Sequence, residues 1–590
     1  MSYIKTMFKM TKGHRLKYFG SFALTFLSVV LMLSSSLMTK VLIDTLSDPS
    51  TLSEFDFSVL NFFGGREFLL NNLYIFSLII VFFALARGTV LISRNIMRAA
   101  VDTSIMKTMQ LRMFNHIIRL PYAKLKSIPS GELLQTASRD EEVLRHFLIY
   151  QINMMVYTFF IVTLSFIILV LLNWKIALVT VALLPILGVY SFFLIKEVRV
   201  RYRATDDSEA RLTSKIEENL SAIRLVKAYN NEVYEINDFE KYIENHEHYF
   251  LRWRRMSSFY SASTDIFIFG QIALALIFSI YLAFSGEISV GTLFLSVTLS
   301  GRIVWPVRRV ANILSNLAQA LASIDRINLI LAEPLEDIDS GLTPEIKGEI
   351  VFEDVSFTYD DGDIAVLKNI NLHVKAGQTV AILGKTGSGK STFVNLLTRL
   401  YDYDSGHIYL DGVELKTIQK AHLRKNVASV LQEPFLFSKT IINNLLIANK
   451  EASDDDIKRA TQIADIHNTI IGFNKGYDTP VGEHGITLSG GQKQRLTIAR
   501  TLINEAPVLI FDDSLSAVDT QTDLNIRTAL QNRAADTTTF IVTHRIATAK
   551  DAHLIIVFED GQISQSGTHE QLIEQDGLYK RIYEIQSRIA

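Results

Sequence analysis

The sequence contains no cysteine among its 590 residues, so disulfide bonds and thiolate-bound metal sites are excluded. It also lacks an excess of charge of either sign, because 59 lysine and arginine residues and 61 aspartate and glutamate residues leave a formal net charge of -2. This balance argues against a nucleic-acid partner. Hydrophobic residues make up 48% of the chain, and their excess falls within about the first 310 residues. Two domains are therefore expected, of which the first lies in a membrane.

Long uncharged runs divide the first domain, which we assign to residues 1–330. Each run is close to or longer than the roughly 20 residues that an α-helix needs to cross a bilayer. A sixth run is interrupted by Arg302 and Pro306, but it is required if the long polar segments and the C-terminal domain share one side of the membrane. The six predicted membrane helices cover residues 18–39, 68–86, 147–174, 176–195, 266–286 and 288–307. We assign residues 331–347 to a linker and 348–590 to a soluble domain, whose motifs are considered below.

Lysine and arginine are distributed unevenly around these spans. The N-terminal residues and the segments 87–145 and 196–255 are rich in basic residues, whereas residues 40–67 are mostly acidic. Because basic loops remain in the cytoplasm, we expect the N-terminus and the C-terminal domain to be cytoplasmic in a multi-pass protein of a bacterial plasma membrane. The first run is longer than the 7 to 15 residues of a signal-peptide core, which favours an uncleaved anchor.

The two long basic segments each hold roughly 60 residues with helical periodicity. At about 1.5 Å per residue each could form a helical hairpin that extends some 40 Å into the cytoplasm. The expected tips are residues 120–130 and 218–230, which could contact a soluble domain. Helix packing within the membrane domain is the alternative explanation for any single residue there.

The soluble domain contains a glycine-rich sequence, GKTGSGKST, between an expected strand and an expected helix. Such a loop directs backbone N–H groups at phosphates, and its glycines permit close approach of the backbone. Lys390 is predicted to reach the β and γ phosphates of ATP, and Ser391 to bind Mg²⁺. The predicted nucleotide-binding residues of this loop are Gly384, Lys385, Thr386, Gly387, Ser388, Gly389, Lys390, Ser391 and Thr392.

Four further side chains stand at the ends of expected strands. Tyr359 could stack on adenine, although a tyrosine at a strand end is more often part of the core or surface. Gln432 could reach the metal or the attacking water, and Asp512 could hold Mg²⁺ through water. His544 could sense the γ phosphate, or it could be a structural histidine. The turn at residues 434–437 is apolar and suited to receive a helix tip.

A second motif, LSGGQ, follows about a hundred residues after the first. Together the motifs resemble those of an ABC exporter half-transporter of the multidrug type. The resemblance implies six transmembrane α-helices with long cytoplasmic helical extensions, followed by an α/β P-loop ATP-binding cassette domain. It also implies a head-to-tail pair of such domains, with each ATP between one P-loop and the other LSGGQ. Since the chain has one copy of each motif, the working unit is expected to be a dimer.

The resemblance assigns further roles by position. It implies adenine stacking for Tyr359, a catalytic role for Gln432 and His544, and metal binding for Ser391, Gln432 and Asp512. The signature and D-loop residues that it adds to the nucleotide site are Ser489, Gly490, Gly491, Gln492 and Asp519.

Asp513 departs from the family pattern, which has glutamate after the Walker B aspartate. The shorter side chain would withdraw the catalytic carboxylate by roughly 1 Å, and a misplacement of that size can slow a reaction about a hundredfold. This resembles the degenerate-site subunit of heterodimeric exporters, in which the partner supplies the glutamate. The intact LSGGQ would then serve the partner's site. A homodimer with two slow sites is the alternative.

The cargo is less clearly indicated by the sequence. Spans rich in aromatic and aliphatic residues suit a hydrophobic small molecule, but helices that face membrane lipid have the same composition. Asp265 and Arg302 are charges within spans, which usually face a cavity or pair with each other, and both are candidate substrate contacts. Arg302 could instead extend to the membrane interface.

Three functions fit the sequence. The favoured one is ATP-driven export of hydrophobic or amphipathic compounds. A lipid or peptide exporter, or a siderophore-type importer on the same fold, is the second. The third is a nucleotide-gated regulator that transports nothing.

Overall fold

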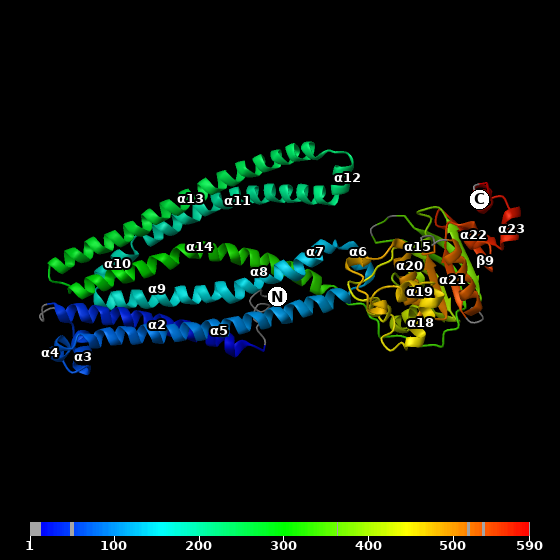
Figure 1. The fold of residues 1–590 in the computed structure, drawn as a ribbon. Helices are drawn as coiled ribbons and strands as arrows, with labels where there is room; N and C mark the ends of the chain where they lie inside the picture. Colours follow the sequence, from blue (N-terminus) through cyan, green and yellow to red (C-terminus); the bar gives the residue numbers. More distant parts are fainter. Residues whose placement is uncertain are drawn as a thin grey trace. The chain divides into compact units, whose positions relative to one another are not determined.

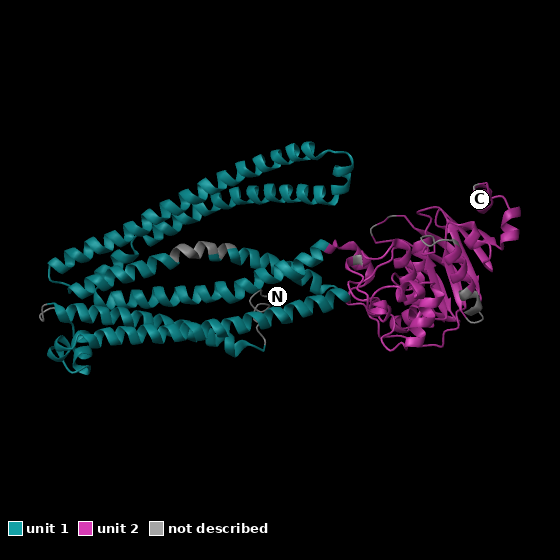
Figure 2. Ribbon diagram, in the orientation of Figure 1, with its two compact units in different colours: residues 1–118, 131–333 teal, residues 119–130, 334–590 magenta. Residues whose placement is uncertain are grey.

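The computed structural model describes residues 13–47, 52–360, 362, 364–515, 520–533 and 537–588. The chain forms two compact units, which are coloured separately in Figure 2. The first comprises residues 1–118 and 131–333, and the second comprises residues 119–130 and 334–590. The first expected hairpin tip therefore groups with the C-terminal unit, whereas α12 (Ile223–Ala228), in the second expected tip, belongs to the first unit.

Long helices build the first unit (Figure 1). Helix α14 packs against α2, α9 and α13, while α11 packs chiefly along α13. The helices are α2 (Arg15–Leu46), α3 (Glu54–Phe62), α4 (Arg66–Asn71), α5 (Tyr74–Ile118), α7 (Ser130–Gln135), α8 (Glu141–His146), α9 (Ile152–Leu172), α10 (Trp174–Val181), α11 (Leu184–Ser221), α12 (Ile223–Ala228), α13 (Glu232–Phe284) and α14 (Val290–Ala332). Two π-helical turns, η2 (Thr136–Asp140) and η3 (Phe147–Gln151), flank α8.

Five helical segments of the described chain are long and apolar enough to cross a membrane, and the sixth apolar stretch, Val290–Pro306, is shorter. The expected span 68–86 begins too early, because residues 68–71 lie in the separate helix α4 and α5 begins at Tyr74. The expected span 147–174 ends too late. Asn173 is extended at φ -163° and caps α10 by accepting a hydrogen bond from the Lys175 backbone, so Trp174 already belongs to the next helix.

A buried ionic cluster joins three segments at the α3 end of the first unit. Lys40 of α2 donates hydrogen bonds to Asp44 and to both carboxylate oxygens of Asp56, and all three side chains are buried. Asp44 also accepts from the Ser289 hydroxyl and the Gly291 backbone at the start of α14. The cluster therefore fixes α2, α3 and α14 to one another.

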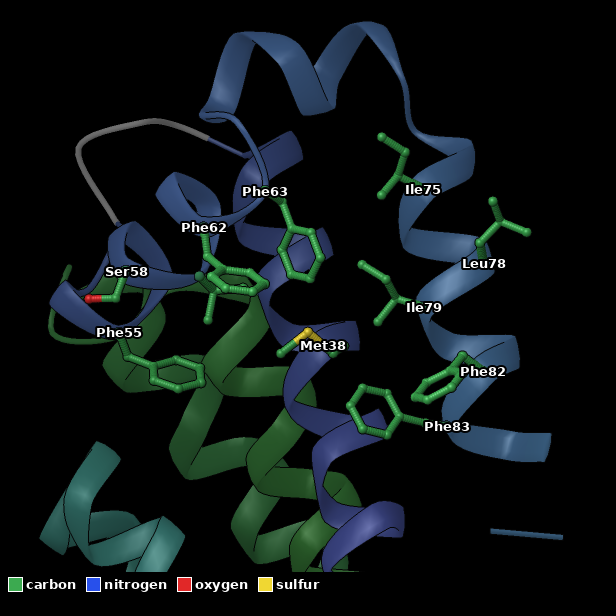
Figure 3. Close-up of a pocket in the computed structure, with 11 residues that line it drawn as sticks. Met38, Phe55, Ser58, Phe62, Phe63, Ile75, Leu78, Ile79, Phe82 and Phe83 are labelled. Carbon is green, nitrogen blue, oxygen red and sulfur yellow. The ribbon is translucent and has the colours of Figure 1, made fainter. Parts of the chain in front are cut away.

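An apolar pocket of about 680 Å³ lies beside this cluster, between α2, α3 and α5 (Figure 3). Its lining is almost entirely hydrophobic and strongly aromatic. The lining residues are Met38, Phe55, Ser58, Val59, Phe62, Phe63, Ile75, Leu78, Ile79, Phe82 and Phe83.

The second unit contains two sheets. A four-stranded antiparallel sheet has the order β2-β1-β4-β5, and a six-stranded sheet has the order β10-β9-β3-β8-β7-β6 with only β10 antiparallel to its neighbour. The strands are β1 (Ile350–Phe357), β2 (Leu367–Val374), β3 (Thr379–Gly384), β4 (Ser405–Leu410), β5 (Val413–Glu414), β6 (Val427–Val430), β7 (Val508–Asp512), β8 (Thr538–Val542), β9 (Leu554–Glu559) and β10 (Gln562–Gly567).

Short helices surround these sheets. The apolar core strands β3, β7 and β8 are buried nearly throughout, as expected for a parallel sheet covered on both faces. The helices are α6 (Tyr122–Ser127), α15 (Lys390–Leu397), α16 (Lys420–Asn426), α17 (Ile441–Leu445), α18 (Asp454–Ile463), α19 (His467–Ile471), α20 (Gly490–Leu502), α21 (Thr520–Arg533), α22 (Ile546–Ala549), α23 (His569–Glu574) and α24 (Leu578–Ser587). The 3-10 turns are Leu415–Thr417, Gly476–Asp478 and Glu483–Gly485.

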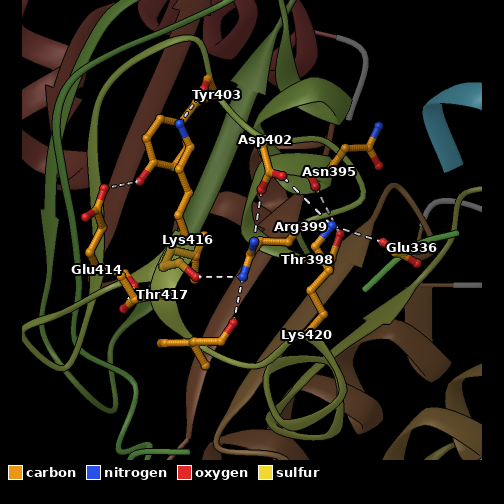
Figure 4. Close-up of polar contacts among 12 residues, drawn as sticks. Glu336, Asn395, Thr398, Arg399, Asp402, Tyr403, Glu414, Lys416, Thr417 and Lys420 are labelled. Atoms are coloured by element: carbon orange, nitrogen blue, oxygen red, sulfur yellow. Dashed lines mark hydrogen bonds and ion pairs between the residues drawn. The ribbon is translucent and has the colours of Figure 1, made fainter. Parts of the chain in front are cut away.

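Ion pairs hold the beginning of segment 334–590 against helix α16 of the same unit (Figure 4). Glu336 accepts hydrogen bonds from Arg424 at 2.7 and 3.0 Å and from Lys420 at 3.2 Å. Burial alone would raise the pKa of Glu336, but the two cations outweigh it and lower that pKa. Glu336 is therefore held charged, and it anchors the chain just after α14 to helix α16.

Candidate ATP-binding site

A cavity of about 320 Å³ lies at the carboxyl ends of the parallel strands. Parallel strands present their carboxyl ends at one edge of a sheet, which is where such folds bind ligands. The cavity brings together side chains that lie up to 185 positions apart along the printed sequence. Its lining residues are Tyr359, Val366, Thr386, Gly387, Gly389, Lys390, Ser391, Thr392, Gln432, Asp512, Asp513, Val542 and His544. Val366 and Val542 were not predicted, because a lone valine has no pattern that marks a ligand contact.

The glycine-rich loop joins the central strand β3 to α15, as predicted. Gly384 has φ +153°, and a Cβ atom there would lie 2.5 Å from the Phe558 carbonyl oxygen. Gly389 has φ +102°, and a Cβ atom there would lie 2.7 Å from Leu367. Both positions therefore require glycine. The buried hydroxyl of Ser388 has no hydrogen-bond partner within the described residues, so the loop keeps an unused polar group for a ligand.

Lys390 holds its ammonium group within the loop. Its Nζ donates hydrogen bonds to the carbonyl oxygens of Gly384 and Lys385, both at 2.8 Å. Burial lowers the pKa of Lys390, and the charges of Asp512 and Asp513 oppose that shift. The side chain lines the cavity, so its donors are positioned to exchange loop carbonyls for phosphate oxygens.

Two of the three predicted metal-binding side chains, Ser391 and Asp512, line the same cavity. The Ser391 hydroxyl acts on the carboxylate of Asp512 at the end of β7. Burial raises the pKa of Asp512, while Ser391 and Lys390 partly offset the rise and the charge of Asp513 adds to it. A hydroxyl beside a carboxylate is an oxygen set suited to Mg²⁺. With the phosphate-facing backbone of the loop, these residues fit a magnesium nucleotide.

Asp513 follows directly and has a left-handed backbone, with φ +46°. Its backbone N–H donates to the Val542 carbonyl at 3.1 Å, which fixes the turn that leaves β7. The side chain lines the same cavity as Asp512 and Lys390. An aspartate therefore occupies the position at which the family pattern has the catalytic glutamate.

Tyr359 lies at the edge of the cavity. Its hydroxyl is 2.9 Å from the Thr392 hydroxyl, and its ring packs edge-on against Tyr401 at 5.1 Å. The expected tip, residues 120–130, reaches the same place, because Lys126 lies 5.4 Å from the Tyr359 ring centroid. Tyr122 packs against Tyr401 at 5.6 Å. Lys126 of the tip therefore contacts Tyr359, the residue predicted to stack on adenine. The sequence did not predict this contact, because the two residues are far apart along the chain.

Gln432 and His544 complete the cavity wall. Both side chains are exposed; Gln432 follows β6 and His544 follows β8, with β7 between the two strands. The backbone carbonyl of His544 accepts a hydrogen bond from Gln586 at 2.7 Å, which holds this turn in place. In the apolar turn after Gln432, Phe435 and Phe437 are 45% and 46% exposed. They form a hydrophobic surface next to the nucleotide site.

The signature motif lies apart from this cavity. Ser489 caps α20, accepting from the Gln492 backbone, and the Gln492 side chain accepts from the Ser489 backbone in return. None of the signature residues appears among the described residues that line the cavity. Ser489 and Gly490 are exposed, and nothing lies within 4 Å of a Cβ atom built on Gly490. The predicted D-loop residue Asp519 lies outside the described residues.

The two candidate substrate residues occupy different helices. Arg302 of α14 is half-buried and donates a hydrogen bond to the Met32 carbonyl of α2 at 3.3 Å. Asp265 is half-buried on α13. Contact of Asp265 and Arg302 with cargo therefore stays a prediction.

Comparison with known proteins agrees with this architecture. Residues 18–307 match the ABC transporter transmembrane region, and residues 367–516 match the ABC transporter family. The uncharacterized ABC transporter ATP-binding protein YknU of Bacillus subtilis (strain 168) is 35% identical over 81% of this chain and 82% of its own length. The ATP-dependent lipid A-core flippase of Desulfotalea psychrophila is 32% identical over 87% of this chain and 90% of its own. A bacterial Atm1-family ABC exporter solved with ATP bound superposes with a TM-score of 0.81, at 24% identity over 97% of this chain and 98% of that one.

The chain belongs to the ABC transporter family and is an exporter half-transporter, with one membrane region and one ATP-binding domain. The predicted fold class is confirmed. The protein is membrane-embedded and couples ATP hydrolysis to transport. Exporters built from such halves act as dimers.

Proposed function

We propose that this chain exports hydrophobic or amphipathic compounds as one half of a heterodimer, and that its own ATP site is degenerate. The observation that supports the second part is the position of Asp513. It lines the cavity with Lys390 and Asp512, so the nucleotide-binding groups are complete while the catalytic carboxylate is one methylene short. Tight binding with slow hydrolysis is the expected result.

The exposed signature supports the pairing. Ser489 and Gly490 stand at the N-terminus of the thirteen-residue helix α20, where backbone N–H groups favour phosphate. Because they lie apart from this chain's own cavity, they are available to the site of a partner. We infer that the partner supplies glutamate and that this chain supplies LSGGQ to the hydrolytic site.

Each residue of the cavity has a defined task in this account. The loop backbone and Lys390 bind and orient the phosphates, while Ser391, Asp512 and Gln432 would hold Mg²⁺, which neutralises phosphate charge when bound. Asp513 would orient water weakly, and His544 would contact the terminal phosphate. Lys126 and Tyr122, in the helix tip, contact Tyr359 and Tyr401 beside the predicted adenine position. A conformational change on nucleotide binding would therefore be transmitted through this tip to the membrane helices.

The membrane topology is part of the proposal. The N-terminus and the ATP-binding domain would face the cytoplasm at a bacterial plasma membrane, and export would follow from that orientation. A lipid exporter is the second candidate, because relatives named lipid A-core flippase match over most of both chains.

Reconstitution tests the transport function. The chain would be purified alone and with the half-transporter encoded beside it, then placed in proteoliposomes with an amphipathic dye outside. ATP-dependent, vanadate-sensitive dye uptake by inside-out molecules only in the mixture would support the heterodimeric exporter. Uptake by this chain alone would support a homodimer. Nucleotide binding without uptake of any dye or labelled lipid would favour a regulator and contradict the proposal.

A further inference from the structure

The apolar pocket of Figure 3 is bordered by three helices of the first unit. Phe62 of α3 and Phe82 of α5 stand on opposite sides of Met38 of α2 (Figure 3). None of the described residues that line the pocket is charged, and the polar one among them is Ser58. Its hydroxyl already donates a hydrogen bond to the Glu54 carbonyl at 2.9 Å. The pocket therefore suits an apolar ligand.

Polar contacts outside the pocket hold its walls in place. The buried pair of Lys40 and Asp56 fixes α3 to α2. Arg66 donates hydrogen bonds to the carbonyl oxygens of Thr45 and Ser47, both at 3.1 Å, which fixes α4 to the end of α2. One buried side chain from each of α2, α3, α4 and α5 joins the same helices in a hydrophobic cluster: Val41, Leu60, Leu69 and Phe76. The fold thus builds the pocket before any ligand arrives.

The pocket opens within the apolar part of two candidate membrane spans, α2 and α5. Only 6% of the most apolar stretch of α5 is buried within the described chain, compared with 39% for α2, so α5 presents this stretch to its surroundings. The α5 wall of the pocket runs from Ile75 to Phe83, which is about 12 Å along a helix. One leaflet of a bilayer provides about 15 Å of hydrocarbon. The wall therefore matches the depth of one leaflet.

The size of the pocket favours a flexible chain over a second protein helix. An α-helix with its side chains is about 10 Å wide, so a volume of about 680 Å³ would hold fewer than about two of its turns. The volume falls within the range of about 300–1,000 Å³ that is typical of pockets for small ligands. An acyl chain can bend to follow the aromatic walls, and an empty pocket would lose those van der Waals contacts.

We propose that this pocket binds one acyl chain of a membrane phospholipid. The lipid belongs to the leaflet at the α3 end of the spans, which the predicted topology places away from the cytoplasm. Lipid tails are as apolar as leucine, so leaving the bilayer supplies little free energy, and contact with the preformed walls decides the binding. Because the described lining carries no charge, the site selects the chain and not the headgroup. Binding here requires no particular cargo.

Photolabelling tests the site in the intact transporter complex. The complex is placed, without ATP, in phosphatidylcholine nanodiscs that contain a trace of phosphatidylcholine with a diazirine in the middle of one palmitoyl chain. After illumination, the labelled residues are identified by mass spectrometry. Residues 55–63 are expected to carry at least about tenfold more label than the exposed residues Ile277, Tyr281 and Phe284 of α13. Even labelling of all these exposed residues would overturn the proposal.

Leu78→Trp and Leu85→Trp form a matched pair of variants. Both leucines lie on one face of α5, seven residues apart, and they are 62% and 67% exposed. Only Leu78 is among the described residues that line the pocket. Because the larger side chain fills the pocket, Leu78→Trp is expected to lower the labelling of residues 55–63 about tenfold. Leu85→Trp is expected to leave it unchanged, and equal labelling in the two variants would contradict the proposal.

A phosphatidylglycerol probe with the same photoreactive chain tests the role of the headgroup. Its labelling of residues 55–63 is expected to lie within about twofold of that by phosphatidylcholine, because charge does not act at an uncharged lining. A strong preference for either headgroup would contradict a chain-selective site. Labelling of Tyr281 without any label on residues 55–63 or 75–83 would show that protein covers the pocket. Loss of label on addition of a transported dye would assign the pocket to cargo, and either result would overturn the lipid site.

Each variant is first checked for purification as a complex and for ATP binding. Should Leu78→Trp fail either check, Ser58→Trp fills the pocket from α3, and the label is then read on residues 75–83. Phe57→Trp is its control, because Phe57 is an exposed residue of α3 outside the described lining. Ser58→Trp is expected to lower the labelling and Phe57→Trp to leave it unchanged, whereas equal effects would contradict the proposal.

Discussion

The Ser391 hydroxyl and the Asp512 carboxylate line one cavity at the end of β7, close enough for Ser391 to lower the pKa of Asp512, which brings together two of the three predicted metal-binding side chains. The carboxylate is partly buried, and this burial raises its pKa. A magnesium ion at this position requires the deprotonated carboxylate. Nucleotide binding that depends on Mg²⁺ should therefore respond to pH in a range where an ordinary aspartate would not.

The affinity for MgATP should fall as the pH drops from neutral, and the fall should begin above the ordinary aspartate pKa of 3.8. Because the pKa of Asp512 lies above its usual value, protons compete with the metal at higher pH than for an exposed aspartate. Binding of a fluorescent ATP analogue with and without Mg²⁺ at several pH values measures the effect. Asp512→Asn should bind more weakly and lose this part of the pH dependence. Identical pH profiles for the two proteins would contradict the assignment.

Replacement of Tyr359 separates stacking from hydrogen bonding. Tyr359→Ala should weaken ATP binding about tenfold, because aromatic stacking on a base contributes roughly 1–3 kcal/mol. Tyr359→Phe removes only the hydroxyl that meets Thr392 and should change the affinity about twofold or less. Tyr409→Ala, on β4 outside the described cavity lining, serves as the control in the same titration. An equal loss in the Ala and Phe variants would show that the ring does not stack on adenine.

The buried ionic cluster should be important for stability. Lys40→Met leaves Asp44 and Asp56 buried without their cation, and removal of one partner of a buried pair costs about 3–5 kcal/mol. Denaturant unfolding in mild detergent measures the loss. Lys175→Met is the control, because its pair with Glu287 is about two-fifths exposed and contributes at most about 1 kcal/mol. Comparable losses in the two variants would contradict a special role for the cluster.

Much of the nucleotide site could be predicted because its chemistry is local in the sequence. GKTGSGKST encodes strand, loop and helix within nine residues, and the carboxyl ends of β6, β7 and β8 necessarily meet beside it. Contacts made by distant segments were not predictable in this way. Lys126 reaches Tyr359 across 233 positions of the printed sequence, and no local pattern marks that contact.

The membrane helices show the same division. Hydropathy located the apolar runs. It did not predict the helix break at Asn72 and Leu73, after which the second long helix, α5, begins at Tyr74. The role of Asn173 as an N-cap, rather than as part of an apolar run, separated α9 from α10.

The central claim is that Asp513 makes this chain's ATP site slow while leaving it able to bind. The most direct measurement is the steady-state ATPase rate of Asp513→Glu beside the parent complex, with the partner's catalytic glutamate replaced by glutamine in both so that only this chain's site is observed, with ATP affinity measured in parallel and Asp560→Glu as a matched control at another left-handed aspartate outside the described cavity lining. We expect Asp513→Glu to raise the rate at least tenfold with little change in affinity, and Asp560→Glu to change neither. An unchanged rate in a well-folded Asp513→Glu protein that still binds ATP would contradict the degenerate-site account.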